Sequence, residues 1–244
     1  MRVKLLSREE LLKSSAASIG VVLNDLQVQQ FIKYYEILVE WNSFMNLTGI
    51  TEYEDVVQKH FVDSLALCKA LDVSKIFSLI DIGTGAGFPG IPLKIAYPHL
   101  KVTLLDSLQK RIKFLNEVVG QLGLENVETI HGRAEDFAKP SLKRESYDVC
   151  VSRAVANLAS LSEYCLPYVK VGGSFIPYKS GKVEEELEES KKAVFLLGGK
   201  IEGEVKFMLP ESDISRSLIR IKKVSATPKK FPRKSGLATK EPIK

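Results

Sequence analysis

The chain has 244 residues, of which 45% are hydrophobic and 27% charged, as in an ordinary soluble globular protein. No apolar run approaches the ~20 residues of a membrane-spanning helix, and charges interrupt the N-terminus where a signal peptide has its apolar core. Three scattered cysteines without a Cys-x-x-Cys pair predict neither disulfides nor a metal site. We expect a cytoplasmic monomer that uses no membrane and no metal.

Charge is unevenly distributed along the chain. Residues 1–215 carry 25 Lys and Arg against 29 Asp and Glu, whereas residues 216–244 carry 10 against one. A mildly acidic body with a basic end favours a polyanionic partner, although a solvated tail with no partner explains the charge equally well.

The first part of the chain, residues 1–70, is predicted to form a helical layer. Ser-Arg-Glu-Glu at 7–10 fits a capping box, in which the first and last side chains cap each other's backbone amides. Apolar residues recur at helical spacing over 25–42. A second capping-box candidate, Thr-Glu-Tyr-Glu at 51–54, begins a helical stretch that runs to about Leu71.

Strands and helices then alternate, which predicts an α/β core with a mostly parallel sheet over residues 71–225. The proline- and lysine-rich residues 226–244 are expected to form a basic extended arm. The expected strands are 77–82, 101–106, 127–130, 147–152, 173–179, 200–208 and 216–224. The expected core helices are 90–97, 108–122, 156–166 and 182–197.

A glycine-rich turn follows the first expected strand. Asp81 ends the apolar run, and Gly83, Gly85 and Gly87 come next. Glycine permits a tight turn and close approach of a nucleotide-like ligand beside the next helix. A dinucleotide fingerprint would place its third glycine at 88, where this chain has Phe88. The Asp-x-Gly-x-Gly-x-Gly spacing that starts at Asp81 instead resembles motif I of class I S-adenosylmethionine-dependent methyltransferases, and this resemblance favours S-adenosylmethionine over NAD.

Acidic residues follow the next two strands. Asp106, with Ser107 after it, ends the second strand, where a carboxylate can accept hydrogen bonds from a ribose. Ala134 and Glu135 follow the third strand, where adenine contacts are expected in such folds. Singly, each acidic residue could be a helix cap or a surface charge. Their occurrence in consecutive strand–helix units is more specific.

Over nearly its whole length the sequence resembles the bacterial 16S rRNA guanosine-N7 methyltransferase family, known as RsmG or GidB. The segments that carry the resemblance are Asn46-Leu-Thr48, His60-Phe-Val-Asp-Ser-Leu65, Asp81-Ile-Gly-Thr-Gly-Ala-Gly-Phe-Pro-Gly-Ile-Pro-Leu93, Asp106-Ser-Leu-Gln-Lys-Arg111, Gly132-Arg-Ala-Glu135, Ser152-Arg-Ala154 and Thr227-Pro-Lys-Lys-Phe-Pro-Arg233.

The resemblance implies a Rossmann-like class I S-adenosylmethionine-dependent methyltransferase with a seven-stranded sheet. It also implies methylation of N7 of a guanosine in the 530 loop of 16S rRNA, so that this rRNA or the small ribosomal subunit is the partner. The residues that match the family's cofactor-binding positions are Gly83, Phe88, Asp106, Ala134, Glu135 and Arg153.

The residues agree with this chemistry. After the fourth strand there is no Asp/Asn-Pro-Pro-Tyr/Phe motif for an exocyclic amine, and no cysteine lies in a Pro-Cys context for attack on a pyrimidine ring. Guanine N7 has an available lone pair, so its methylation needs alignment and no general base. We therefore predict no catalytic base.

Arg153, Lys179 and His60 are candidates to position the substrate, although Arg153 and Lys179 could be surface ion pairs. His60 lies one helical turn from Asp63, and a structural hydrogen bond between them is the favoured interpretation.

In the arm, cations could bind phosphates and Phe231 could stack on a base. The candidate RNA-binding residues are Lys229, Lys230, Phe231, Arg233 and Lys234. Two alternatives stay open: methylation of another RNA or a small molecule, and a non-catalytic role in ribosome assembly.

Overall fold

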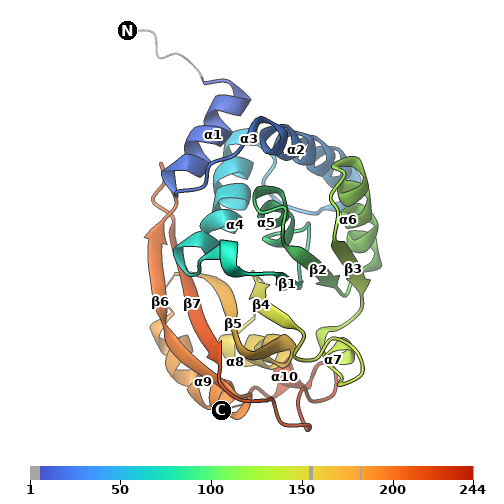
Figure 1. Cartoon of the computed structure of the whole chain (residues 1–244), viewed down its shortest axis with the longest axis vertical. Coiled ribbons are helices and arrows are strands. Elements are labelled where there is room, and N and C mark those ends of the chain that lie inside the picture. Colours follow the sequence, from blue (N-terminus) through green and yellow to red (C-terminus); the bar gives the residue numbers. More distant parts are fainter. Residues whose placement is uncertain (1–5, 154–155, 182, 244) are drawn as a thin grey trace.

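A seven-stranded sheet forms the centre of the computed structural model, which describes residues 6–153, 156–181 and 183–243 (Figure 1). The strand order is β3-β2-β1-β4-β5-β7-β6; β1 to β5 are parallel, and β7 pairs antiparallel with both β5 and β6. The strands are β1 Ser78–Ile82, β2 Lys101–Asp106, β3 Val127–His131, β4 Tyr147–Ser152, β5 Val169–Ser180, β6 Gly199–Met208 and β7 Ser215–Lys223. The predicted mostly parallel, seven-stranded sheet is confirmed.

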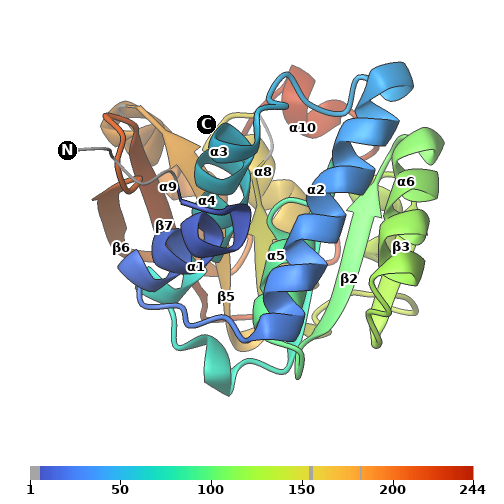
Figure 2. The same cartoon turned by 90° about the horizontal axis from the view of Figure 1, so that it is seen from above.

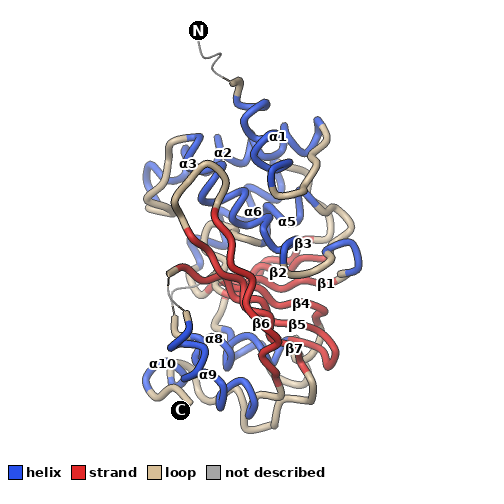
Figure 3. Tube along the Cα trace, turned by 90° about the vertical axis from the view of Figure 1, so that its left-hand side faces the viewer, coloured by secondary structure: helices blue, strands red, loops and turns tan. Residues whose placement is uncertain are grey.

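Helices cover both faces of this sheet (Figure 3). On one face lie α1 Arg8–Ser18, α2 Asp25–Met45, α3 Tyr53–Val56, α4 Asp63–Leu65, α5 Gly90–Ala96 and α6 Gln109–Gln121. On the other lie α8 Leu158–Cys165, α9 Glu184–Leu196 and α10 Leu237–Lys240, while α7 Ala134–Phe137 follows β3. Short helical turns occupy Val57–Val62, Ala66–Lys69, Val73–Lys75 and Leu166–Tyr168.

Each face of the sheet has its own apolar core. Along β1, Leu79 packs into the core on the α2 side, whereas Ile80 and Ile82 pack into the core on the α8 side. This division follows because successive side chains of a strand point to opposite faces of the sheet. A parallel strand that is buried on both faces therefore carries apolar side chains on both.

The N-terminal helices pack directly on the core. Figure 2 shows α2 lying over α5 and beside α6, and α2 contacts both. The predicted capping box at Ser7 is confirmed, since Ser7 Oγ accepts from the Glu10 amide at 3.2 Å and Glu10 Oε2 accepts from the Ser7 amide at 2.7 Å. The second predicted capping box is wrong: α3 is N-capped by Glu52, without a side-chain hydrogen bond, and Thr51 lies outside the helix.

The expectation of an extended C-terminal arm is also wrong. Residues 227–241, which we call the C-terminal segment, fold against the α8 face and include α10. The Arg144 guanidinium donates to the backbone carbonyls of Thr227 at 2.5 Å and Phe231 at 2.8 Å. Phe231 is only 6% exposed. Arg144 lies more than eighty residues earlier in the chain, so the composition of the segment itself does not reveal this partner.

Candidate active site

The glycine loop lies at the carboxyl end of β1. Gly83, Gly85 and Gly87 all have positive φ, which favours glycine. A Cβ on Gly87 would stand 2.6 Å from Ile91 Cγ1 and 2.8 Å from the Tyr34 hydroxyl. Tyr34 belongs to α2 and donates to the Ala86 carbonyl at 2.5 Å. The N-terminal layer therefore braces the loop directly.

Asp81 lies beneath the loop, fully buried. Its Oδ2 accepts from the Thr84 hydroxyl at 2.7 Å and from the Gly90 amide at 2.9 Å, while Oδ1 has no partner among the described residues. Burial raises the pKa of Asp81 to about 6. Neither Asp81 nor Gly87 is among the residues that line the adjacent pockets. The sequence placed both residues in the cofactor site, and the structure gives both a role in shaping the loop.

Two adjoining pockets of about 450 and 360 Å³ open beside the loop and share Gly83, Asp106 and Ser107. We call them together the groove. Among the other predicted cofactor residues, Ala134 and Glu135 line the first pocket. Gly85, Phe88 and Arg153 line the second pocket. The structure thus brings together predicted residues from four separate segments of the sequence.

Asp106 shows how the groove would hold a nucleoside. Its carboxylate accepts from the amides of Gly85 and Leu108, both at 2.9 Å, and pairs with Arg111 at 3.1 Å. A carboxylate offers about four acceptor sites, so a ribose diol would replace the Arg111 contacts. The Arg111 side chain is 35% exposed, so water could solvate it after this replacement. With the apolar side chains of Leu108 and Leu161 in the same pocket, these residues fit S-adenosylmethionine.

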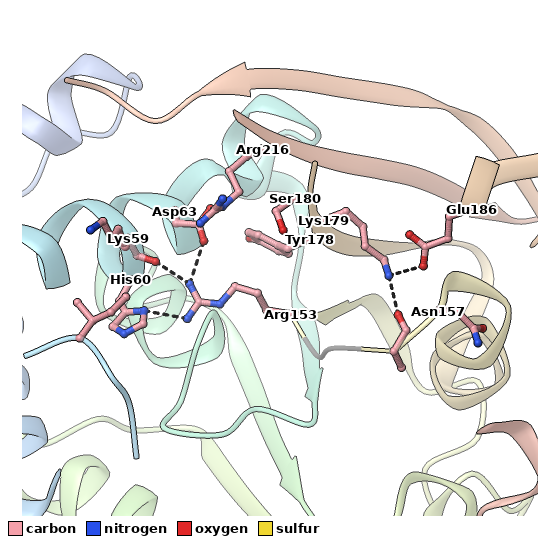
Figure 4. Close-up of a pocket in the computed structure, with 12 residues that line it drawn as sticks. Lys59, His60, Asp63, Arg153, Asn157, Tyr178, Lys179, Ser180, Glu186 and Arg216 are labelled. Atoms are coloured by element: carbon pink, nitrogen blue, oxygen red, sulfur yellow. Dashed lines mark hydrogen bonds and ion pairs between the residues drawn. The ribbon is translucent and has the colours of Figure 1, made fainter. Parts of the chain in front are cut away.

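A third pocket of about 690 Å³, which we call the cleft (Figure 4), shares His60, Arg153 and Ala156 with the groove. Arg153 follows β4, and its guanidinium reaches the N-terminal layer. It donates to Asp63 Oδ2 at 3.0 Å and to the Lys59 carbonyl at 3.2 Å, and it lies 5.0 Å from the centre of the Phe88 ring. Since the Asp63 side chain is only 3% exposed, the contact is not an ordinary surface ion pair.

His60 is held as a neutral ring. Burial, and then the neighbouring Arg153, lower the pKa of His60 to about 3. A guanidinium can only donate, so the 3.2 Å contact with Arg153 makes His60 Nδ1 an acceptor and leaves the proton on Nε2. Nε2 then donates to the Thr48 hydroxyl at 2.8 Å. The ring stacks on Phe88 with its centre 4.5 Å away. Both nitrogens are engaged, and neither is placed to take a proton from a substrate.

Asp63 joins two arginines, which the sequence did not reveal. Its Oδ1 accepts from Arg216 Nε at 3.2 Å, while Oδ2 accepts from Arg153. The expected hydrogen bond between His60 and Asp63 is replaced by contacts of both with Arg153. Both side chains line the cleft. Arg216 comes from β7, and no local pattern singled it out.

Lys179 lies on the opposite side of the cleft (Figure 4). Its ammonium donates to Glu186 Oε1 and to the Ala156 carbonyl, both at 2.6 Å, and the side chain is 11% exposed. It is a partly buried ion pair that lines a cavity, and it stays a candidate to position the substrate.

The predicted RNA-binding residues separate into two groups. Lys229, Lys230 and Lys234 are exposed on the C-terminal segment. Phe231 is buried, and Arg233 pairs with Glu163 at 2.7 Å. The prediction that Phe231 stacks on a base is therefore wrong for this fold, and Arg233 already has a protein partner.

Within residues 6–153, 156–181 and 183–243, no cluster of three or more His, Cys, Asp or Glu side chains could hold a metal ion. No helix in the same ranges is long and apolar enough to cross a bilayer.

The strand order, the glycine loop after β1 and the acidic residue that ends β2 define a Rossmann-like class I methyltransferase fold. Solved structures share it. A SAM-dependent methyltransferase from Aquifex aeolicus is 19% identical with a TM-score of 0.51, and 68% of this chain and 92% of that chain are covered. For a putative RNA methyltransferase from Pyrococcus horikoshii the identity is 15%, the TM-score 0.51, and the coverage 67% and 84%.

Sequence comparison gives the family. The family described as rRNA small subunit methyltransferase G matches residues 27–234. A ribosomal RNA small subunit methyltransferase G from Lachnoclostridium phytofermentans is 60% identical over 93% of both chains. One from Acetivibrio thermocellus is 53% identical over the full length of both. This chain belongs to that family, GidB.

Proposed function

We propose that this chain is an S-adenosylmethionine-dependent methyltransferase of small-subunit ribosomal RNA in the cytoplasm. We further propose that it methylates N7 of a guanosine in the 530 loop of 16S rRNA. Family membership supports the class of substrate, and the resemblance of the motifs supports the particular nucleotide.

One observation carries the proposal: the groove and the cleft meet at His60, Arg153 and Ala156. A cofactor in the groove and a base in the cleft would lie on the two sides of these residues. Phe88, which stacks on His60 and faces Arg153, gives the junction an apolar surface. Such a junction favours alignment of two reactants and exclusion of water.

Methylation of N7 requires no general base from the protein. When bound, S-adenosylmethionine would supply a methyl group on its sulfonium sulfur, and guanine N7 has a free lone pair and carries no proton that the protein would have to remove. His60 is neutral and engaged at both nitrogens, so it orients Arg153 and Phe88. Asp63 fixes the Arg153 guanidinium at the boundary between groove and cleft.

The charges of the cleft support a polyanionic substrate. Among the described residues, the lining of the cleft has four cationic side chains and two carboxylates. His60 is neutral and is not counted among the cations. The cationic residues are Lys59, Arg153, Lys179 and Arg216, and the carboxylates are Asp63 and Glu186. The exposed lysines of the C-terminal segment add to this field.

Labelled S-adenosylmethionine, 16S rRNA and small ribosomal subunits test the proposal. Digestion of the rRNA to nucleosides should give labelled N7-methylguanosine, and fragment mapping should place it in the 530 loop. Label in another nucleoside would support a different RNA methyltransferase. Binding of the subunit without any transfer would support a non-catalytic assembly factor.

A further inference from the structure

The C-terminal segment runs from the end of the sheet to the groove. At its start the Lys223 ammonium, which is fully buried, contacts the Thr227 hydroxyl and donates to the Leu166 carbonyl at 2.8 Å. The Thr227 amide donates to Glu145 Oε1 at 2.7 Å. Together with Arg144, these groups fix the path of the segment before it reaches α8.

The middle of the segment is held by one ion pair. The Arg233 side chain donates from Nε and Nη2 to the Glu163 carboxylate, at 3.0 Å to Oε1 and 2.7 Å to Oε2, and its backbone amide adds a bond of 2.7 Å to Oε1. Glu163 belongs to α8 and is 1% exposed. A bidentate partner of this kind compensates a buried carboxylate for the hydration that it loses on burial.

The end of the segment forms part of the groove. Gly236 lines the pocket that contains Asp106 and Glu135, and its amide donates to Glu135 Oε1 at 2.8 Å. Tyr164, which lines the same pocket, shares a hydrogen bond of 2.6 Å with the Thr239 hydroxyl. Two side chains that face the groove therefore also hold the segment in place.

We propose that the C-terminal segment is a wall of the cofactor groove, and that Arg233 is the residue that positions this wall. The inference rests on the proposed use of the groove for S-adenosylmethionine. Arg233 acts through Glu163, since it is not among the residues that line the groove. The exposed lysines of the segment are the proposed RNA contacts, so docking of the segment links the RNA surface to the cofactor site. By thermodynamic linkage, cofactor binding and segment docking stabilise each other to the same extent.

Hydrogen exchange on the full-length protein tests this linkage without any substitution. S-adenosylmethionine should slow exchange of the amides in residues 227–241, because closing of the wall and ligand binding are coupled. Equal exchange in this segment with and without saturating cofactor overturns the inference.

Calorimetry of cofactor binding without RNA gives a second test. Arg233→Met removes the ion pair with Glu163. If the segment then stays docked in about one molecule in ten, the apparent Kd for S-adenosylmethionine rises about tenfold. The matched control is Lys191→Met, which removes an exposed ion pair with Glu188 on α9. The control should leave the Kd unchanged.

Arg233→Met also leaves Glu163 buried without a partner, so the double variant Arg233→Met/Glu163→Gln keeps the test valid should the single variant fail to fold. A wild-type Kd in either folded variant overturns the role of Arg233. Failure of the wild-type protein to bind S-adenosylmethionine would instead overturn the proposed function.

Discussion

Replacing Asp63 with alanine tests the arrangement at the boundary of groove and cleft. The Asp63 carboxylate is 3% exposed and accepts from Arg153 at 3.0 Å and from Arg216 at 3.2 Å. Its removal leaves two guanidinium groups close together without their shared counterion. Removing one partner of a fully buried ion pair costs about 3 to 5 kcal/mol. Since the two arginine side chains are 20% and 21% exposed and can recover some water, we expect about 2 to 3 kcal/mol.

Denaturant unfolding measures this loss, and methyl transfer measures its effect on activity. We expect kcat/KM to fall because Arg153 is no longer fixed beside Phe88. Combining Asp63→Ala with Arg216→Met relieves the repulsion between the guanidinium groups, so the double variant should lose less stability than the sum of the single variants. Strictly additive losses, or an unfolding free energy equal to that of the wild type, would refute the reasoning.

Three further predictions follow from the geometry. Because folding lowers the pKa of His60 to about 3, the stability that neutral His60 contributes should be complete above about pH 6.5 and should fall as the pH drops toward 3. His60→Gln should therefore reduce the loss of unfolding free energy at acidic pH. An unchanged dependence of the unfolding free energy on pH would contradict this. Gly87→Ala should lower the unfolding free energy by about 2 to 4 kcal/mol, because the added Cβ overlaps its neighbours and φ is positive. Gly20 also has a positive φ but has no neighbour within 4 Å of the added Cβ, so Gly20→Ala should lower the unfolding free energy by only about 1 kcal/mol. Equal losses would disprove the packing argument. Neutralising the exposed lysines Lys229, Lys230 and Lys234 should reduce the slope of the logarithm of the RNA-binding constant against the logarithm of the salt concentration by about 2. An unaltered slope would show that these lysines do not contact the RNA.

The sequence was sufficient for the features that depend on neighbours along the chain. Alternation of strands and helices placed the sheet, and the helix predicted over 25–42 is extended by three residues at its C-terminal end. The glycine loop, Asp106 and Glu135 were found because each lies at or shortly after the carboxyl end of a strand, and the carboxyl ends of parallel strands meet at one edge of the sheet.

What the sequence missed depends on contacts between distant segments. Arg216 reaches Asp63 across 153 positions, and Arg144 reaches the carbonyl of Phe231 across 87. The composition of residues 226–244 predicts an arm in solvent, because nothing local indicates that Glu163 and Arg144 are buried partners for it. Asp81 looks like a ligand contact in the sequence, yet its position below the loop is set by the amide of Gly90.

The proposed function depends on binding of S-adenosylmethionine in the groove through Asp106, and calorimetry tests this binding most directly. We predict that the wild-type protein binds S-adenosylmethionine and not NAD, and that Asp106→Asn weakens binding by roughly ten- to a hundredfold, because hydrogen bonds to a charged acceptor contribute about 1.5 to 3 kcal/mol. Exposed Asp72→Asn is the matched control and should bind as the wild type does. No binding of S-adenosylmethionine, or a preference for NAD, would contradict the account.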